Sequence, residues 1–305
     1  MSTDKIKNLN IVLDGLMNRY AARVPDVNRV RECMVRDGLI AKISDIENDH
    51  IAFRTMGVPQ LGIKSFEKIF LNYGYERRDP FYFEGKKLNA FWYSPPEDKY
   101  PRVFISELRI GDLSEEAQRI ICSYTDEVKS DPVNSLNLDN GVDVEEFLHT
   151  PLWRTPTWSD YQRLAEESEY AAWVIYNRYY LNHFTVSVHN LPKGYNTIDQ
   201  FNAYLEKNNF KLNDAGGKAK KSPDGLLIQS STVAEMVDAE FSDGAGGSIK
   251  KSISGSYVEF AERRVLPEYQ NLPEDAIGRM HRRDGFEAGN ADKIFESTYS
   301  TQTSR

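Results

Sequence analysis

Cysteine, positive charge and long apolar runs are all scarce in this sequence. Among its 305 residues only Cys33 and Cys122 are cysteines, which predicts reduced thiols and a cytoplasmic setting rather than a disulfide scaffold. Lys and Arg number 38 against 46 Asp and Glu, and the resulting net charge of −8 argues against a nucleic-acid-binding protein. No apolar run approaches the roughly 20 residues of a membrane-spanning helix, so no membrane insertion is expected. The polar start MSTDKIKNLN lacks the apolar region of a secretion signal.

Apolar and aromatic residues are plentiful, at 40% and 12% of the chain, so the sequence can build a full hydrophobic core. Its length fits one large or two ordinary domains. Helical and strand-like periodicities divide the chain into five segments of one continuous unit. These are N-terminal helices (1–45), a first β-rich module (46–110), a helical insertion (111–180), a second β-rich module (181–265) and a loop-rich C-terminal tail (266–305) whose Ser/Thr-rich end is expected to fray.

The two β-rich modules repeat the same order of elements. Each opens with an acidic or amide residue followed by a histidine, in DHIAFRT at His50 and in NHFTVSV at His183. A helix and further strands follow, and each module closes on a strand with a glutamate near an arginine, VFISELR and YVEFAER. Glu107 in the first closing strand thereby parallels the carboxylate Glu259 of the second. This self-similarity indicates two copies of one supersecondary unit.

Strand alternation places polar side chains on one face of each module. His50 shares a face with Arg54, His183 lies on the polar face of its strand, and Glu259 shares a face with Arg263. Two histidines and one carboxylate on adjacent strands form the facial triad of non-haem Fe(II) enzymes, which leaves positions open for a 2-oxo acid and O₂. The plain alternative is that both histidines bond to backbone and that Glu259 pairs with Arg263 at the surface.

Six segments of the sequence together resemble one protein family. They are DHIAFRT, VFISELR, NHFTVSV, LLIQSST, YVEFAERR and GFEAGNADKIFEST, and the resemblance extends over about residues 10–300. The family is that of the 2-oxoadipate dioxygenase/decarboxylases, within the vicinal-oxygen-chelate superfamily. The resemblance implies an α+β fold in which paired βαβββ modules form a curved sheet around a metal site, with an N-terminal helical segment and a helical insertion.

The same resemblance implies a chemistry and a set of site residues. The family's reaction converts 2-oxoadipate and O₂ to 2-hydroxyglutarate and CO₂ in lysine breakdown, with Fe(II) as the cofactor. His50, His183 and Glu259 would be the metal ligands. Glu259 is preferred over Glu262 because it matches the E-x-x-x-R pattern of the last metal strand. Arg54 would act in catalysis by holding a substrate carboxylate. Further polar contacts to the substrate are expected from Gln229, Ser231 and Arg263.

Two alternatives stay open. One is another vicinal-oxygen-chelate metalloenzyme that acts on a different 2-oxo acid, and the other is a metal-free protein of the same fold that binds a small molecule. The net charge of −8 also opposes an anionic substrate, so local positive charge from Arg54 and Arg263 is required. Some members of the family close the site with an additional C-terminal region, a part that residues 266–305 would have to supply here.

Overall fold

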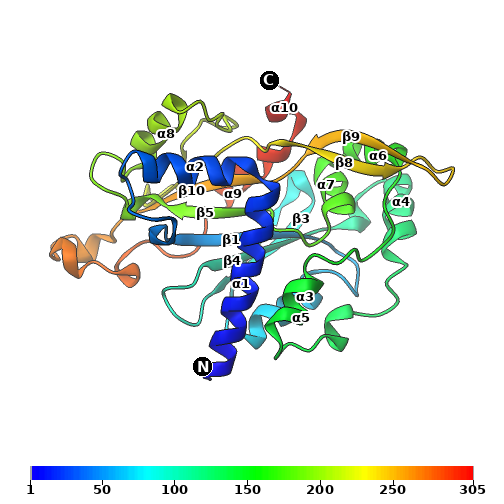
Figure 1. Cartoon of the computed structure of the whole chain (residues 1–305), viewed down its shortest axis with the longest axis horizontal. Helices are drawn as coiled ribbons and strands as arrows, with labels where there is room; N and C mark the ends of the chain where they lie inside the picture. The colour runs from blue at the N-terminus through cyan, green and yellow to red at the C-terminus, as the bar shows by residue number, and fades with distance from the viewer. Residues whose placement is uncertain (1, 305) are drawn as a thin grey trace.

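A mixed eight-stranded sheet forms the centre of the molecule (Figure 1). The computed structural model describes residues 2–304. Strands from the first half of the chain fill one half of the sheet, and strands from the second half fill the other. In sheet order the strands are β2 (Glu76–Phe83), β3 (Leu88–Ser94), β4 (Arg102–Leu108), β1 (Asn48–Met56), β5 (His183–Ser187), β10 (Tyr257–Arg263), β7 (Leu227–Ser231) and β6 (Lys220–Lys221).

The two halves of the sheet share one topology. In each, the first and last strands run parallel, β1 beside β4 and β5 beside β10. The last strand is also antiparallel to its other neighbour, β3 in the first half and β7 in the second. A helix follows each first strand, α3 (Ile63–Asn72) after β1 and α8 (Ile198–Lys207) after β5. The halves meet antiparallel at β1 and β5, which confirms the predicted α+β fold of paired βαβββ modules.

Helices and one separate hairpin surround this sheet (Figure 1). The hairpin is inserted into the second module between β7 and β10. None of the helices within residues 2–304 has the length and apolar character needed to cross a membrane. The further elements are α1 (Thr3–Arg23), α2 (Pro25–Arg36), α4 (Glu115–Thr125), α5 (Gly141–Phe147), α6 (Trp158–Glu167), α7 (Glu169–Asn177), α9 (Ala288–Phe295), α10 (Ser300–Thr303) and the hairpin strands β8 (Met236–Ser242) and β9 (Ser248–Ser254).

The central strands bury both of their faces, but against different partners. On one face Phe184 of β5 packs against Tyr20 of α1, with ring centroids 6.0 Å apart. On the other face the ring of His50 lies against Phe286 from the C-terminal segment, at 4.8 Å. Because side chains alternate along a strand, His50 of β1, His183 of β5 and Glu259 of β10 turn towards the same face as Phe286 of the C-terminal segment. That segment therefore covers the face on which a site was predicted.

Two glutamates at equivalent positions anchor the module helices. Glu107 Oε2 accepts a hydrogen bond from the backbone N–H of Ile63 at 2.9 Å, and Glu262 Oε2 accepts one from Ile198 at 2.8 Å. Ile63 and Ile198 are the first residues of α3 and α8, where N–H groups lack partners within the helix. Glu107 is thus the counterpart of Glu262, and its expected equivalence to Glu259 is wrong.

Replacing Glu262 with alanine should lower the free energy of unfolding by about 2 kcal/mol, because a buried N–H group of α8 loses its acceptor. Urea denaturation followed by circular dichroism measures the change. Glu274 is an exposed glutamate, and its replacement by alanine should change stability by less than about 0.5 kcal/mol. Equal effects of the two substitutions would contradict the anchoring role.

The structure departs from the sequence-based expectation at two places. Strand β2, with the sequence ERRDPFYF, was not expected, because it is exposed along most of its length and contains Pro80. The fraying predicted for the Ser/Thr-rich end of the tail is also wrong, because that end forms α10 with Gln302 buried, and α9 before it packs on the sheet. The eight residues of α9 are too few for helical periodicity to stand out among their polar and glycine neighbours.

Candidate metal centre

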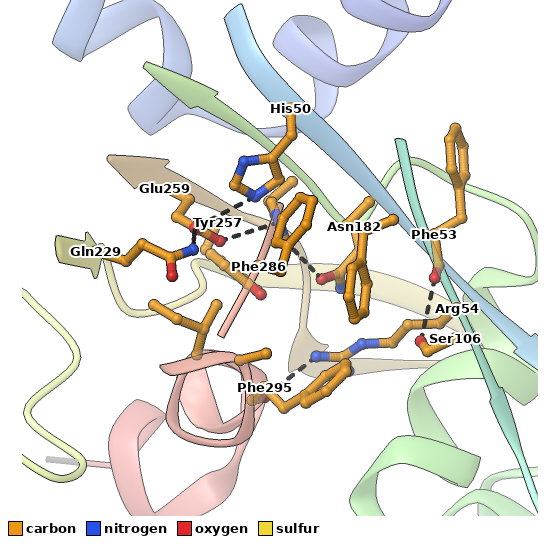
Figure 2. Close-up of a pocket in the computed structure, with 15 residues that line it drawn as sticks. His50, Phe53, Arg54, Ser106, Asn182, Gln229, Tyr257, Glu259, Phe286 and Phe295 are labelled. Carbon is orange, nitrogen blue, oxygen red and sulfur yellow. Dashed lines mark hydrogen bonds and ion pairs between the residues drawn. The ribbon is translucent and has the colours of Figure 1, made fainter. Parts of the chain in front are cut away.

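Two histidines and a glutamate converge at the seam between the modules. Figure 2 shows two of them, His50 and Glu259, pointing towards each other. His50 lies on β1, His183 on β5 and Glu259 on β10, three adjacent strands. His183 Nε2 lies 3.0 Å from Glu259 Oε2, and His50 Nε2 lies 3.3 Å from Glu259 Oε1. The three potential ligand atoms all lie within 4.8 Å of one another, and all three residues are buried. The structure thus brings together the residues nominated as metal ligands.

The residue before each histidine orients its ring. Asp49 Oδ1 lies 2.8 Å from His50 Nδ1, and Asn182 Oδ1 lies 3.0 Å from His183 Nδ1. A hydrogen bond at Nδ1 fixes the tautomer and leaves Nε2 to face the cluster, which is the usual arrangement of a metal-binding histidine. The acid-or-amide residue that opens each module in the sequence therefore has a structural role.

Hydrogen bonding also holds the carboxylate in place. Gln229 Nε2 donates to Glu259 Oε1 at 2.6 Å, and Asn290 Nδ2 of α9 donates to Gln229 Oε1 at 3.0 Å. Gln229 does line the cavity, as the sequence suggested, but its amide is engaged with Glu259. Helix α9 is thereby connected to the carboxylate of Glu259 through the side chain of Gln229.

Burial and neighbouring charges give Glu259 and His183 the protonation states that a metal ion needs, and they act differently on His50. Burial raises the pKa of Glu259, but the neighbouring His50 and His183 outweigh this and hold that pKa far below its usual value. Burial lowers the pKa of His183, which favours a neutral ring. Burial also lowers the pKa of His50, but the charges of Glu259 and Asp49 raise it overall. A proton on His50 therefore supplies the positive charge that a bound cation would otherwise supply.

These donors fit a divalent transition metal. Two imidazoles and one carboxylate are the ligand set of non-haem Fe(II) sites with open positions. The buried Nε2 of His183 makes no hydrogen bond within residues 2–304, although it faces Glu259. A buried nitrogen without a hydrogen bond costs stability, and binding a metal ion would satisfy it.

Arg54 lies in the same cavity, away from His50 and next to Phe295 (Figure 2). Its guanidinium donates to Thr298 Oγ1 at 3.0 Å and to the carbonyl of Phe295 at 3.1 Å. The side chain is buried against the rings of Tyr170 and Trp173, and it forms no ion pair with a carboxylate within residues 2–304. An arginine buried without a carboxylate is a ready partner for an anionic ligand.

The remaining nominated residues lie elsewhere. Ser231 Oγ is 2.8 Å from Ser297 Oγ, and Arg263 forms a two-pronged ion pair with Asp49 at 2.6 and 2.9 Å. Neither lines the cavity, which corrects the expectation that they contact the substrate. Arg263 instead holds Asp49, and Asp49 orients His50. Alternation along β10 gave the face of Arg263 but not its distance from the centre.

The cavity walls include residues that the sequence did not single out. Its apolar wall comes from the first module and from the C-terminal segment, and the hydroxyl of Tyr257 is buried there without a hydrogen-bond partner within residues 2–304. Tyr257 stands two residues before Glu259, so strand alternation could have identified it. The apolar members are Ala52, Phe104, Phe286, Ala291, Ile294 and Phe295.

Phe104 occupies the place in the first module that Glu259 holds in the second. β4 pairs Phe104 with Ala52, and β10 pairs Glu259 with Thr185. Ala52 and Thr185 each follow a module histidine by two residues. The paired architecture thus offers a fourth side chain to the centre, and here that side chain is a phenyl ring, which cannot bind a metal. This side of the centre stays available to a small molecule.

Replacing Phe104 with glutamate should add a fourth protein ligand and tighten divalent-metal binding by an amount on the order of tenfold. Competition with a chelator measures the affinity, and the absorption spectrum of the Co(II)-loaded protein reports the coordination number. The Phe104→Leu variant is the control and should match the wild type in both measurements. An unchanged affinity and spectrum in a folded Phe104→Glu protein would contradict the equivalence.

Two βαβββ modules with a buried two-histidine, one-carboxylate cluster at their seam define a protein of the vicinal-oxygen-chelate class. The family model of the 2-oxoadipate dioxygenase/decarboxylases matches residues 12–280. The chain therefore belongs to the 2-oxoadipate dioxygenase/decarboxylase family.

Individual relatives agree with this assignment. The chain is 47% identical over 307 residues to the chloroplastic 2-oxoadipate dioxygenase/decarboxylase of Arabidopsis thaliana, covering 96% of this chain and 78% of that protein. The solved structure of a hydroxyglutarate synthase in complex with 2-oxoadipate, from Oryza sativa, superposes with a TM-score of 0.89 at 40% identity and covers 100% of this chain and 96% of its own. A glyoxalase-superfamily protein of Ralstonia eutropha, with a TM-score of 0.69, 18% identity and coverage of 90% and 84%, shares the fold alone.

Proposed function

We propose that this protein is an Fe(II)-dependent enzyme that converts 2-oxoadipate and O₂ to 2-hydroxyglutarate and CO₂. The observation that carries the proposal is the chemistry of one buried cavity, which holds a metal-type ligand set and, apart from it, the unpaired cation Arg54. A 2-oxo dicarboxylate has a metal-chelating group at one end and a negative charge at the other. The relatives of known name support the same substrate.

The proposed reaction balances without a second substrate. The first carboxylate of 2-oxoadipate leaves as CO₂, one atom of O₂ enters the new carboxylate at the former oxo carbon, and the other becomes the hydroxyl on the next carbon. A bound Fe(II) would supply a chelation site for the 2-oxo acid and the electrons that activate O₂. His50, His183 and Glu259 would hold this metal, with rings and carboxylate fixed by Asp49, Asn182 and Gln229.

The other residues of the cavity would bind and enclose the substrate. Arg54 would pair with the distal carboxylate, and the unpartnered Tyr257 hydroxyl would donate a hydrogen bond to it or to the 2-oxo acid. The rings of Phe104, Phe286 and Phe295 would exclude water from the reacting carbons. The cavity volume is about 20 Å³, close to that of one water-sized sphere, so the cavity walls must move apart before a six-carbon acid can bind.

An oxygen-electrode assay tests the proposal. Protein loaded with Fe(II) under anaerobic conditions should consume O₂ with 2-oxoadipate and release one CO₂ for each O₂. Uptake with 2-oxohexanoate, which lacks the distal carboxylate, should be far slower. Adding 2-oxoadipate without O₂ should give a visible charge-transfer band. Absence of both uptake and band would overturn the proposal, and a protein that binds 2-oxoadipate but takes up no metal would be a binding protein instead.

We further infer that the reaction serves lysine breakdown and takes place in the cytoplasm. Support for a reducing compartment comes from Cys33 and Cys122, which are both free thiols. The Arabidopsis relative is described as chloroplastic, so compartments can differ within the family. Cell fractionation with an antibody to this protein tests the location, and accumulation of 2-oxoadipate on lysine in cells that lack it tests the pathway.

A further inference from the structure

A second cavity lies on the other side of Asp49 from the candidate metal centre. It has a volume of about 140 Å³ and is formed by the end of β10, the start of β4 and the segment 277–282. Asp49 separates it from the first cavity, because the same carboxylate faces Arg263 and, through Oδ1, His50. Four arginines line it, namely Arg102, Arg263, Arg279 and Arg282.

The positive charge in this cavity exceeds the negative charge. Arg263 and Arg102 both pair with Asp49, at 2.6 Å and 3.4 Å, and Arg102 also pairs with Asp284. The second acidic side chain of the cavity, Glu47, accepts hydrogen bonds from neutral groups on Ser187 and Asn190. The charge of Glu47 favours the charged form of Arg282 without an ion pair between them, so two carboxylates, Asp49 and Glu47, face four arginines in this cavity.

Arg279 and Arg282 form no ion pair within the described part of the chain. Arg279 Nη1 donates to the backbone carbonyls of Asp98 and Tyr100, at 2.7 and 2.8 Å, and Arg282 Nη1 donates to the carbonyl of Arg263 at 2.9 Å. The Nη2 atom of Arg279 is buried and has no hydrogen-bond partner among residues 2–304. A guanidinium nitrogen buried without an acceptor is unfavourable, and an oxyanion in the cavity would supply one.

The proximity of these arginines has an electrostatic cost. Burial, together with the charges of Arg263 and Arg279, lowers the pKa of Arg102 to about 10 against the opposing effect of Asp49. His189, at the same cavity, is kept neutral because burial lowers its pKa to about 4, to which Arg282 and Arg263 contribute. An anion would relieve the repulsion among the arginines.

We propose that this cavity is a binding site for a small oxyanion, either a phosphate or the carboxylate of an organic acid. Planar guanidinium groups bind both classes in two-pronged geometry. The anion would be held by Arg279 and Arg282, with Arg102 and Arg263 at its inner side. The inner arginines also form ion pairs with Asp49, and Asp49 orients His50. A bound anion would therefore compete with Asp49 for these arginines.

Isothermal titration calorimetry of the full-length protein in a chloride buffer tests the site, with inorganic phosphate and glutarate as separate probes. The wild type should bind at least one of them at one site per chain, and which one binds identifies the source of the oxyanion. Arg279→Gln/Arg282→Gln should weaken that binding by an amount on the order of tenfold or more, because both charged donors are removed. Each single variant should give part of the loss, which keeps the test valid if the double variant is unstable.

Two controls locate the bound anion. Arg283 lies in the same segment but pairs with Asp224 and does not line the cavity, so Arg283→Gln should retain the wild-type affinity. Arg54→Met removes the cation of the first cavity and should also retain it. Loss of binding in Arg54→Met but not in the Arg279 and Arg282 variants would place the anion in the first cavity and overturn the proposal. Absence of binding by both probes would overturn it as well.

Discussion

Arg54→Met should lower kcat/KM for 2-oxoadipate by a factor on the order of 10³, because a buried carboxylate of the substrate would lose its charged partner. The same change should have little effect on 2-oxohexanoate, which has no distal carboxylate. The preference of the enzyme for the diacid over the monoacid should therefore collapse, and steady-state O₂ uptake with both acids measures it. An equal loss of activity on both acids would show that Arg54 does not bind the distal carboxylate of 2-oxoadipate.

The stability of this variant should move in the opposite direction to its activity. Arg54 is buried without a carboxylate partner, so methionine of similar length should leave the free energy of unfolding unchanged or raise it by about 1–4 kcal/mol. Arg263→Met is the matched comparison, since Arg263 is equally buried but pairs with Asp49. That variant should lose about 3–5 kcal/mol, because Asp49 loses its main partner. Thermal unfolding of the metal-free proteins distinguishes a residue kept for binding from one kept for structure.

His183→Ala should remove most of the bound metal, weakening Fe(II) binding by more than about 100-fold, because even residues that only orient a metal ligand contribute 10- to 100-fold. The wild type should carry one iron per chain after anaerobic loading, measured by elemental analysis, and the variant should carry little. O₂ uptake with 2-oxoadipate should fall with it.

His281→Ala is the control for this substitution, since His281 lies in the C-terminal tail and outside the candidate centre. It should keep both metal and activity. Wild-type metal content in His183→Ala would exclude His183 as a ligand and leave the alternative in which it only packs within the sheet. Added imidazole should restore part of the metal binding if the alanine has opened a ligand-sized space.

The sequence was informative where the signal is local and repeated. Alternation within DHIAFRT and NHFTVSV, with the repeat itself, was sufficient to nominate His50 and His183, and the sheet places both on one face. The predicted equivalence of Glu107 and Glu259 was wrong. It rested on a Glu–Arg pair that recurs in both closing strands, whereas the strand pairing matches Phe104 to Glu259. Only pairing between strands, which short motifs do not encode, resolves that three-residue difference.

Contacts between distant parts of the chain could not be predicted from the sequence for a different reason. Gln229, Ser231 and Arg263 were nominated as substrate contacts because each lies on a polar strand face. Their actual partners, Asn290, Ser297 and Asp49, come from other elements, and these partners decide whether a polar group is free or engaged. A polar side chain on the face of the site can bind a ligand only when its polar atoms are not already hydrogen-bonded to other residues.

The C-terminal cover also bears on how the protein is made. The three candidate ligands are all present once β10 has left the ribosome, whereas Phe286, Asn290 and Phe295, which enclose them and bond to their supports, are synthesised afterwards. A growing chain would thus expose a complete ligand set before the lid exists, an interval in which metal could enter without passing the closed cavity. Damage confined to the last part of the chain would have a specific consequence for bound iron. It would leave a protein able to bind iron yet unable to shield it, and so convert a controlled oxidation into a source of stray oxidants.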